Sequence, residues 1–469
     1  MCRPDIREDL KEPLIKKTKT TTTAAENSSS SCCRKISIFT ILIIFVVFPM
    51  SFIVLLSEIC GGWTTLYTSG VRFSTTRDIP DLTGQVAIVT GANTGIGYIS
   101  ALELARHNAT VIVASRNPSK GQNAVVKIQQ ELGITTTTEG EEHNDRRVKF
   151  IQLDLNSLSS VSKFVDEFNK LGSKIMNDSD DDDDTNANTN TNTIMPLHIL
   201  LNNAGIMKSP GAKFIGQNLT YGYSTTVDGF ESHIGVNHIG HFYLTMLLVD
   251  NLKLAAANGN GYARVVQVAS NAEQNAYDNG VGFVYDDWLP TNNDGIMPES
   301  YEDGCAYGQS KLANILFVKE LSKRLQKQSH DDDTLQNITA YSCHPGVIQT
   351  DLFLDLEQQT NDDLLKKSWF EQQLAKVFGT LFSYSMMSPQ VGAMNQLYLA
   401  TASPEDDSNL VNGGYYTPIG RLSKPIHPAV VSVSSDDNIS DELINAAASK
   451  LWEETINALR KVNIDVPTL

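Results

Sequence analysis

Short runs of apolar residues recur along the chain, and segments with apolar residues three or four positions apart separate them. The first pattern is typical of buried strands and the second of helices that pack one face on a core. The expected strands are Gln85–Thr90, Ala109–Ala114, Val148–Leu153, Leu197–Leu201, Arg264–Val268 and Ile338–Cys343, with a weaker seventh at Gly413–Tyr416. The expected helices are Tyr98–His107, Asn123–Leu132, Leu158–Leu171, Glu231–Leu254 and Cys305–Gln326. This alternation predicts an α/β fold with a parallel sheet.

Two polar stretches interrupt the pattern. Thr135–Asp145 is rich in Thr and Glu, and Asn177–Thr193 consists of Asp, Asn and Thr with almost no apolar residue. Low-complexity segments of this kind read as surface insertions rather than as domain boundaries. We therefore expect one domain over residues 80–469, with insertions near 135–145 and 177–193.

The first 56 residues have a different pattern. Residues 1–35 are polar and aperiodic, which is typical of a disordered tail. Ile36–Leu56 is an uncharged stretch of 21 residues, long enough to cross a bilayer core of about 30 Å as a helix. A cleaved signal peptide or a buried core helix would also be apolar, but a signal peptide has a shorter leader and a shorter apolar core. We expect a retained single-pass transmembrane anchor at 36–56.

The flanking charges predict an orientation for this anchor. Five Lys or Arg residues lie within twenty positions before the span, and Arg72 is the one that follows within twenty. The positive-inside rule then places the tail in the cytosol and the body in the lumen, in the endoplasmic reticulum or another endomembrane. Asn-x-Ser/Thr sequons at Asn177, Asn218, Asn337 and Asn438 would face a glycosylating compartment, although such sequons are common by chance.

Composition excludes some classes of function. The formal net charge of −17 leaves no broad basic surface to neutralise phosphates, so a nucleic-acid partner is not expected. The 41% hydrophobic content allows a sizeable core. The six cysteines form no Cys-x-x-Cys pattern, and we expect no metal site.

The first expected strand runs into the glycine-rich segment Gly91-Ala-Asn-Thr-Gly95-Ile-Gly97 and then into an expected helix. Glycines allow a tight turn and a close approach of the backbone, and a helix N-terminus offers free N–H groups to phosphate. In this strand–turn–helix context the segment predicts a dinucleotide site.

Tyr307 and Lys311 lie four residues apart on one face of an expected helix. A phenol ordinarily ionises near pH 10, and a nearby ammonium favours the phenolate. The pair therefore suits a general acid/base, although most Tyr-x-x-x-Lys pairs are surface residues.

These segments together resemble the short-chain dehydrogenase/reductase family. The glycine-rich turn has the spacing of that family, and further segments follow in its order. They are Asp154-Leu155, Asn202-Asn203-Ala204-Gly205, Asn237, Ser270, Tyr307 with Lys311, and Pro345-Gly346 with Thr350. The resemblance covers roughly residues 80–420, and more weakly extends to Trp452. It implies a Rossmann-type, doubly wound parallel sheet and a nicotinamide cofactor.

The resemblance implies a role for each matching residue. Tyr307 would deliver or remove a proton, and Ser270 would hydrogen-bond the substrate oxygen. Lys311 would lower the pKa of the tyrosine and hold the nicotinamide ribose, and Asn237 would position a water that links Lys311 to solvent. The residues implied to contact the cofactor are Gly91, Asn93, Thr94, Gly95, Ile96, Gly97, Arg116, Asp154, Leu155, Asn203, Ala204, Gly205, Tyr307, Lys311, Pro345, Gly346 and Thr350.

The end of the second expected strand bears on the choice of cofactor. An acidic residue there would hold the ribose hydroxyl of NAD, whereas a basic one suits the phosphate of NADP. The chain has Ser115-Arg116 and no acid. We expect NADP(H), with NAD(H) as the alternative if Arg116 only faces solvent.

Three segments narrow the resemblance to retinol dehydrogenases and to relatives similar to WW-domain oxidoreductases and protochlorophyllide reductases. They are Thr226–Glu231, His233–Phe242 and Ser310–Asn314. With the apolar span, they imply a lipophilic substrate such as a retinoid, steroid or fatty aldehyde, taken from the bilayer. The family also includes dimers and tetramers, which leaves a homo-oligomer open.

Some segments depart from the family pattern. Lys208–Thr225 is long, the stretch between Ser270 and Tyr307 is long and acidic, and Leu352–Ser385 has no residue-level match. An alternative hypothesis is a non-catalytic nucleotide-binding scaffold, although such a protein need not retain all of Asn237, Ser270, Tyr307 and Lys311. A structural membrane protein would leave the glycine turn unexplained.

Overall fold

The computed structural model describes most of the chain after residue 70. The described residues are 71–134, 147–177, 194–207, 223–257, 261–277, 283, 285, 288, 301–329, 332–348, 386–405, 407–425, 427, 437–467 and 469. The expected tail (1–35), the expected anchor (36–56) and most of the two expected insertions lie outside these residues. No helix in the described part of the chain is both long and apolar enough to span a membrane.

Within the described residues, eight strands form one sheet in the order β3-β2-β1-β4-β5-β6-β7-β8. The strands are β1 Val86–Thr90, β2 Thr110–Ser115, β3 Val148–Gln152, β4 Ile199–Asn202, β5 Ala263–Val268, β6 Ile338–Cys343, β7 Tyr415–Thr417 and β8 Arg421–Ser423. Neighbouring strands from β3 to β7 are parallel, and β8 runs antiparallel to β7. The prediction of an α/β fold with a parallel sheet is confirmed.

Alternation along the central strands produces two separate cores. Ala87 and Val89 of β1 face one core, and Ile88 between them faces the other. Successive side chains of a strand point to opposite faces, and a sheet that is covered on both faces is apolar throughout. The strands could therefore be recognised as continuous apolar runs.

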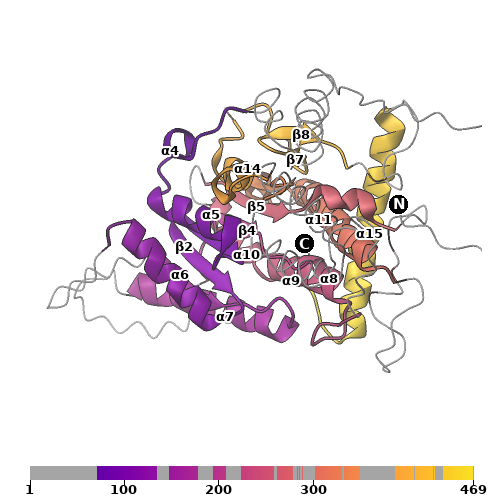
Figure 1. Ribbon diagram of the computed structural model, residues 1–469, viewed down its shortest axis with the longest axis horizontal. Helices are drawn as coiled ribbons and strands as arrows, with labels where there is room; N and C mark the ends of the chain where they lie inside the picture. The colour runs from indigo at the N-terminus through magenta and orange to yellow at the C-terminus, as the bar shows by residue number, and fades with distance from the viewer. Residues whose placement is uncertain are drawn as a thin grey trace, which may run out of the picture.

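Helices cover both faces of the sheet (Figure 1). One face carries α5 Gly95–Arg106, α6 Pro118–Glu131 and α14 Pro389–Thr401. The other carries α7 Leu158–Asn177, α9 Gly240–Leu247, α10 Val249–Ala257 and α11 Asp303–Gln328, with α15 Asp437–Lys461 packed on α11. The shorter elements are α4 Thr75–Asp78, α8 Ser232–Ile234, the π-helix η2 Gly235–Ile239 and the 3-10 helices η3 Asn271–Asn275 and η5 Asp333–Asn337.

The single helix expected over Glu231–Leu254 is wrong in detail. The structure instead has α8, the π-helical segment η2 and α9 in direct succession, and α10 starts anew at Val249. Asn237 lies in the middle of the π-helix. A π-helical turn inserts one residue into a helix and is frequent at functional sites. Apolar spacing cannot reveal it, because the residues on both sides remain buried.

Candidate active site

The glycine-rich turn connects β1 to α5 at the carboxyl edge of the sheet. Gly91 and Gly95 have positive φ angles of 67° and 59°, which L side chains rarely adopt. A Cβ on Gly97 would lie 2.4 Å from Asn203 Nδ2 and 2.6 Å from the Gly91 carbonyl oxygen, so a side chain cannot be accommodated there. Asn93 and Thr94 complete the turn before α5, and Ile96 lies in its first turn. The turn is therefore closely packed on its own backbone and on Asn203, and its approach to a diphosphate stays a prediction.

Thr90 ties this turn to the segment that follows β4. Its hydroxyl oxygen accepts hydrogen bonds from the backbone N–H groups of Asn203 and Ala204, both at 2.9 Å. Its carbonyl oxygen accepts from Asn203 Nδ2 at 2.8 Å. Gly205 follows directly, and a Cβ placed there would lie 3.2 Å from Lys311 Nζ. The segment 203–205 therefore bridges the glycine turn and Lys311.

A buried histidine completes the same network. His241 Nδ1 lies 3.0 Å from the Asn237 carbonyl oxygen, which can only accept, so Nδ1 carries the proton. Burial lowers the pKa of His241 to about 4, and the ring is therefore neutral. Its bare Nε2 then accepts from the Thr90 hydroxyl at 3.0 Å. His241 positions the turn and is not placed to exchange protons at physiological pH.

Asn237 connects the π-helix to two other elements. Its Oδ1 accepts a hydrogen bond from the backbone N–H of Ile206 at 2.8 Å, and its Nδ2 donates to the carbonyl oxygen of Ile206 at 3.0 Å. The same Nδ2 donates to Ser310 Oγ of α11 at 3.0 Å. These bonds occupy the side-chain amide, so any water bound by Asn237 would have to use the second lone pair of its carbonyl oxygen.

Tyr307 and Lys311 share one face of α11. Lys311 Nζ lies 5.6 Å from the centre of the Tyr307 ring and 3.4 Å from the Val268 carbonyl oxygen. Burial raises the pKa of Tyr307 to about 12, although a hydrogen bond with Ser270 acts in the opposite direction. Burial also lowers the pKa of Lys311 to about 8.

These values depart from the expectation that Lys311 lowers the pKa of the tyrosine. Desolvation opposes the charged form of both groups, and it is the largest cause of both shifts. Tyr307 is therefore a protonated phenol in this structure, hydrogen-bonded to Ser270, which lies two residues beyond the end of β5. A protonated phenol is a proton donor.

The segment after β6 forms the other side of the site. Gly346 has a φ of 91°, and a Cβ there would lie 2.3 Å from Met387 Sδ. His344, which precedes Pro345, is 3% exposed, and neither of its ring nitrogens has a hydrogen-bond partner among the described residues. Burial and the charge of Lys311 lower the pKa of His344 to about 3. Thr350, the last matching residue of this segment, lies outside the described residues.

The remaining predicted cofactor residues follow β2 and β3 at the same edge. Arg116 is exposed just beyond β2, and its carbonyl oxygen accepts from Gln152 Nε2 at 3.2 Å. Asp154 accepts from the Asn156 N–H at 3.0 Å. The carbonyl oxygen of Leu155 would lie 2.9 Å from a Cβ on Gly240 at the start of α9. Because parallel strands end at one edge, all the described candidate residues lie along a single border of the sheet.

Two positioning residues on α14 were not predicted from the sequence. Asn395 Nδ2 donates to the His344 carbonyl oxygen at 2.8 Å, beside Pro345-Gly346. The next residue, Gln396, donates from Nε2 to Ser100 Oγ at 2.6 Å and lies 3.4 Å from Asn203 Oδ1. Helix α14 is thus bonded both to the part of the site around the glycine turn and to the part around Pro345-Gly346. An Asn-Gln pair in the middle of an otherwise apolar segment was the available signal.

Comparison with known proteins shows the family to which this chain belongs. The family model described as short chain dehydrogenase matches residues 85–176. An uncharacterized oxidoreductase of Schizosaccharomyces pombe is 35% identical over 79% of this chain and 85% of its own length. Human retinol dehydrogenase 11 is 33% identical over 84% and 90% of the two chains, and human polyprenol dehydrogenase is 32% identical over 74% and 81%. The chain therefore belongs to the short-chain dehydrogenase/reductase family of oxidoreductases and is retinol dehydrogenase-like.

Proposed function

We propose that this protein interconverts a carbonyl and an alcohol on a lipophilic substrate, with NADP(H) as the hydride carrier and Tyr307 as the general acid/base. The observation that carries the proposal is the arrangement of Tyr307, hydrogen-bonded to Ser270, with Lys311 on the next turn of α11. All three lie at the sheet edge that carries the glycine turn.

The residues present fit a dinucleotide. Gly91 and Gly97 carry no side chain, so the turn packs closely on Asn203 and Ala204, and Gly95 begins α5, whose N-terminal N–H groups would face a diphosphate. Asn203, Ala204 and Gly205 line the opposite side of the turn. The two ring nitrogens of His344, which have no hydrogen-bond partner within the described part of the chain, offer polar contacts beside Pro345-Gly346. When bound, the cofactor supplies or accepts the hydride.

In the reductive direction Tyr307 gives its proton to the carbonyl oxygen as negative charge develops there. Ser270 donates a hydrogen bond to the same oxygen, which stabilises that charge. Lys311, with its pKa lowered to about 8, can then exchange a proton near neutral pH and restore the phenol. Oxidation of an alcohol runs through the same groups in reverse.

Arg116 supports the choice of NADP(H), because a guanidinium suits a ribose phosphate and no acid lies beside it at the end of β2. The lipophilic substrate class is supported by relatives named for retinol and polyprenol, and by the apolar span 36–56 that would hold the protein at an endomembrane.

The test is a screen of the detergent-solubilised full chain against retinal, steroid, fatty-aldehyde and quinone panels, with NADPH and NADH in parallel. We expect carbonyl-dependent oxidation of NADPH, slower oxidation of NADH, and the loss of almost all turnover in Tyr307→Phe with cofactor binding retained. Wild-type activity in Tyr307→Phe would refute the proposed mechanism. A clear preference for NADH would refute the assignment of the cofactor alone.

A further inference from the structure

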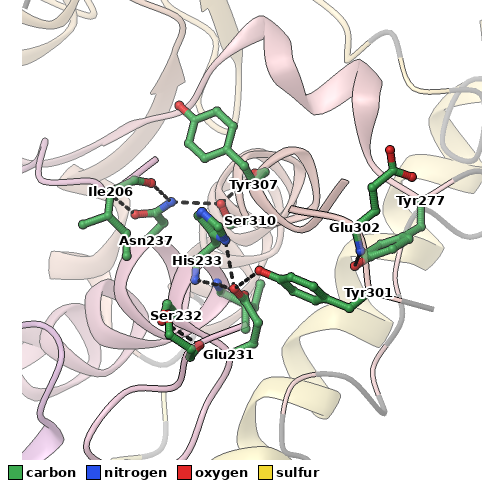
Figure 2. Close-up of polar contacts among 12 residues, drawn as sticks. Ile206, Glu231, Ser232, His233, Asn237, Tyr277, Tyr301, Glu302, Tyr307 and Ser310 are labelled. Carbon is green, nitrogen blue, oxygen red and sulfur yellow. Dashed lines mark hydrogen bonds and ion pairs between the residues drawn. The ribbon is translucent and has the colours of Figure 1, made fainter. Parts of the chain in front are cut away.

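A buried carboxylate lies close to Tyr307 and has no part in the chemistry described above. The side chain of Glu231 is 2% exposed. Its Oε1 accepts from the N–H and from Nδ1 of His233, at 2.9 and 2.8 Å, and from the hydroxyl of Tyr301 at 3.1 Å. Its Oε2 accepts from the N–H of Ile234 at 2.9 Å. Figure 2 shows the bonds from His233 and Tyr301 converging on this carboxyl group.

The bonds keep this carboxyl group ionised. Burial alone would raise the pKa of Glu231, but the hydrogen bonds and the charge interaction with His233 outweigh it, and the pKa lies below its usual value. A buried carboxylate that loses one of its partners is left partly unsatisfied, which is costly. The geometry around Glu231 is therefore firmly specified.

Glu231 joins two helices that both carry candidate active-site residues. It is the N-cap of α8, which continues through the π-helix that holds Asn237. Tyr301 precedes α11, and its hydroxyl is also within reach of Asp303, the first residue of that helix. The Glu231–Tyr301 bond therefore fixes the start of one helix against the start of the other.

A second contact joins the same helices further along. Ser310 Oγ accepts from Asn237 Nδ2 at 3.0 Å and donates to the carbonyl oxygen of Tyr307 at 2.7 Å. Between the two contacts, the ring of His233 meets the ring of Tyr307 edge-on, with centroids 6.0 Å apart and planes at 74° (Figure 2). Tyr307 is thus held by its backbone and by its ring.

We propose that Glu231 is a positioning residue for Tyr307, acting through the hydroxyl of Tyr301 on the start of α11 and through the imidazole of His233 on the phenol ring. The proposal rests on the proposed role of Tyr307. A displacement of about 1 Å in a reacting group can reduce a rate about 100-fold. A carboxylate that fixes both the helix and the ring therefore acts on kcat. None of the hydrogen bonds of Glu231 described above involves the glycine turn, so we expect the affinity for the dinucleotide phosphates to be retained.

The test is Tyr301→Phe, which removes the hydroxyl and keeps the ring that packs edge-on against Tyr223 at 5.0 Å. We expect kcat to fall about tenfold, because losing one of the two contacts should displace Tyr307 by less than the roughly 1 Å that costs about 100-fold. The KM for the cofactor should stay within about twofold of the wild-type value. The matched control is Tyr398→Phe, which removes another tyrosine–carboxylate bond, from Tyr398 to Asp407 at 2.7 Å, in a different part of the fold. The control should lose a similar amount of thermal stability while kcat stays at the wild-type value.

If Tyr301→Phe does not fold, His233→Phe provides the same test, because it keeps an aromatic ring against Tyr307 and removes the Nδ1 donor. A wild-type kcat in the folded variant, or a loss of kcat equal to that of Tyr398→Phe, would overturn the positioning role. A failure of this positioning role can be distinguished from a failure of the proposed function. An active Tyr307→Phe would refute the role of Tyr307 itself, whereas an inactive Tyr307→Phe with a fully active Tyr301→Phe would refute only the role of Glu231.

Discussion

At the scale of single residues, burial dominates the titration of the site. Tyr307 and Lys311 are both desolvated, so the pKa of the phenol rises to about 12 and the pKa of the ammonium falls to about 8. The sequence places the two groups four residues apart, but their spacing alone cannot reveal how deeply they are buried. This is why their pairing could be predicted and the direction of the tyrosine shift could not.

The lowered pKa of Lys311 predicts that the stability of the protein depends on pH. Between about pH 8 and the ordinary lysine pKa of 10.5, the unfolded chain binds the proton more tightly, so rising pH stabilises the folded protein. Below pH 8 the full cost of the buried charge is present. Lys311→Met should therefore raise the free energy of unfolding at pH 7 by on the order of 3 kcal/mol, at about 1.36 kcal/mol per pKa unit.

Urea unfolding of the protein without cofactor at pH 7 and at pH 9.5 measures this effect. The increase in the free energy of unfolding caused by Lys311→Met should be smaller at pH 9.5 than at pH 7. The control Lys327→Met changes an exposed lysine of the same helix and should have little effect on stability at either pH. A Lys311→Met variant less stable than wild type at pH 7 would contradict the direction of the shift.

At the scale of elements, the glycine turn shows what a strand–turn–helix pattern can predict. Strand β1, the turn and α5 all follow from the sequence, because each requires particular residue types at fixed positions. The π-helix around Asn237 could not be predicted, since its extra residue leaves the apolar pattern intact. Helix α14 was also missed, because it is buried on most of its surface and lacks a clear polar face.

The close packing of the glycine turn predicts that a methyl group added at Gly97 weakens cofactor binding. In Gly97→Ala the new Cβ would overlap the Gly91 carbonyl oxygen at 2.6 Å, and this backbone atom cannot move without displacing the turn. We expect the Kd for NADP(H) to increase by at least about tenfold, because the N–H groups that face the phosphates would move.

Calorimetry with purified protein measures this change in Kd. Gly304→Ala is the matched control, since Gly304 also lies in the first turn of a helix and its Cβ would have no atom within 4 Å. Equal affinities for wild type and Gly97→Ala would show that the turn does not bind the dinucleotide.

At the scale of the whole molecule, α15 closes the core on the side of α11. Trp452 meets Phe242 with ring centroids 4.9 Å apart and stacks on Phe317 at 6.0 Å. The hydroxyl of Thr455, also on α15, lies 2.9 Å from Nε2 of the buried His238. The resemblance reached Trp452 only weakly, and this helix was not predicted, although the helical spacing of Ile444, Leu451 and Leu459 was the available signal. Its contribution to the core is visible only in the fold.

This packing predicts a large loss of stability on truncation. Trp452→Ala should reduce the free energy of unfolding by about 3–5 kcal/mol, because it removes a buried aromatic side chain and leaves a cavity. Leu443→Ala is the control on the same helix, since Leu443 is 41% exposed and should cost less than about 1 kcal/mol. Guanidinium unfolding measures both, and equal losses would indicate that α15 does not anchor the core through Trp452.

The strand order also has a consequence for the way in which the chain folds. β1 pairs with β2, and β2 with β3, through segments that are close in the sequence, whereas the pairing of β1 with β4 joins Ala87 to Ile199 across more than one hundred residues. Long-range parallel pairing forms slowly, because a long loop must close before any contact compensates for the lost entropy. The close contact between Gly91 and Ala204, which sets the glycine turn against the segment after β4, exists only once β4 has paired with β1. A ligand held there would slow unfolding and would leave the early steps of folding unchanged.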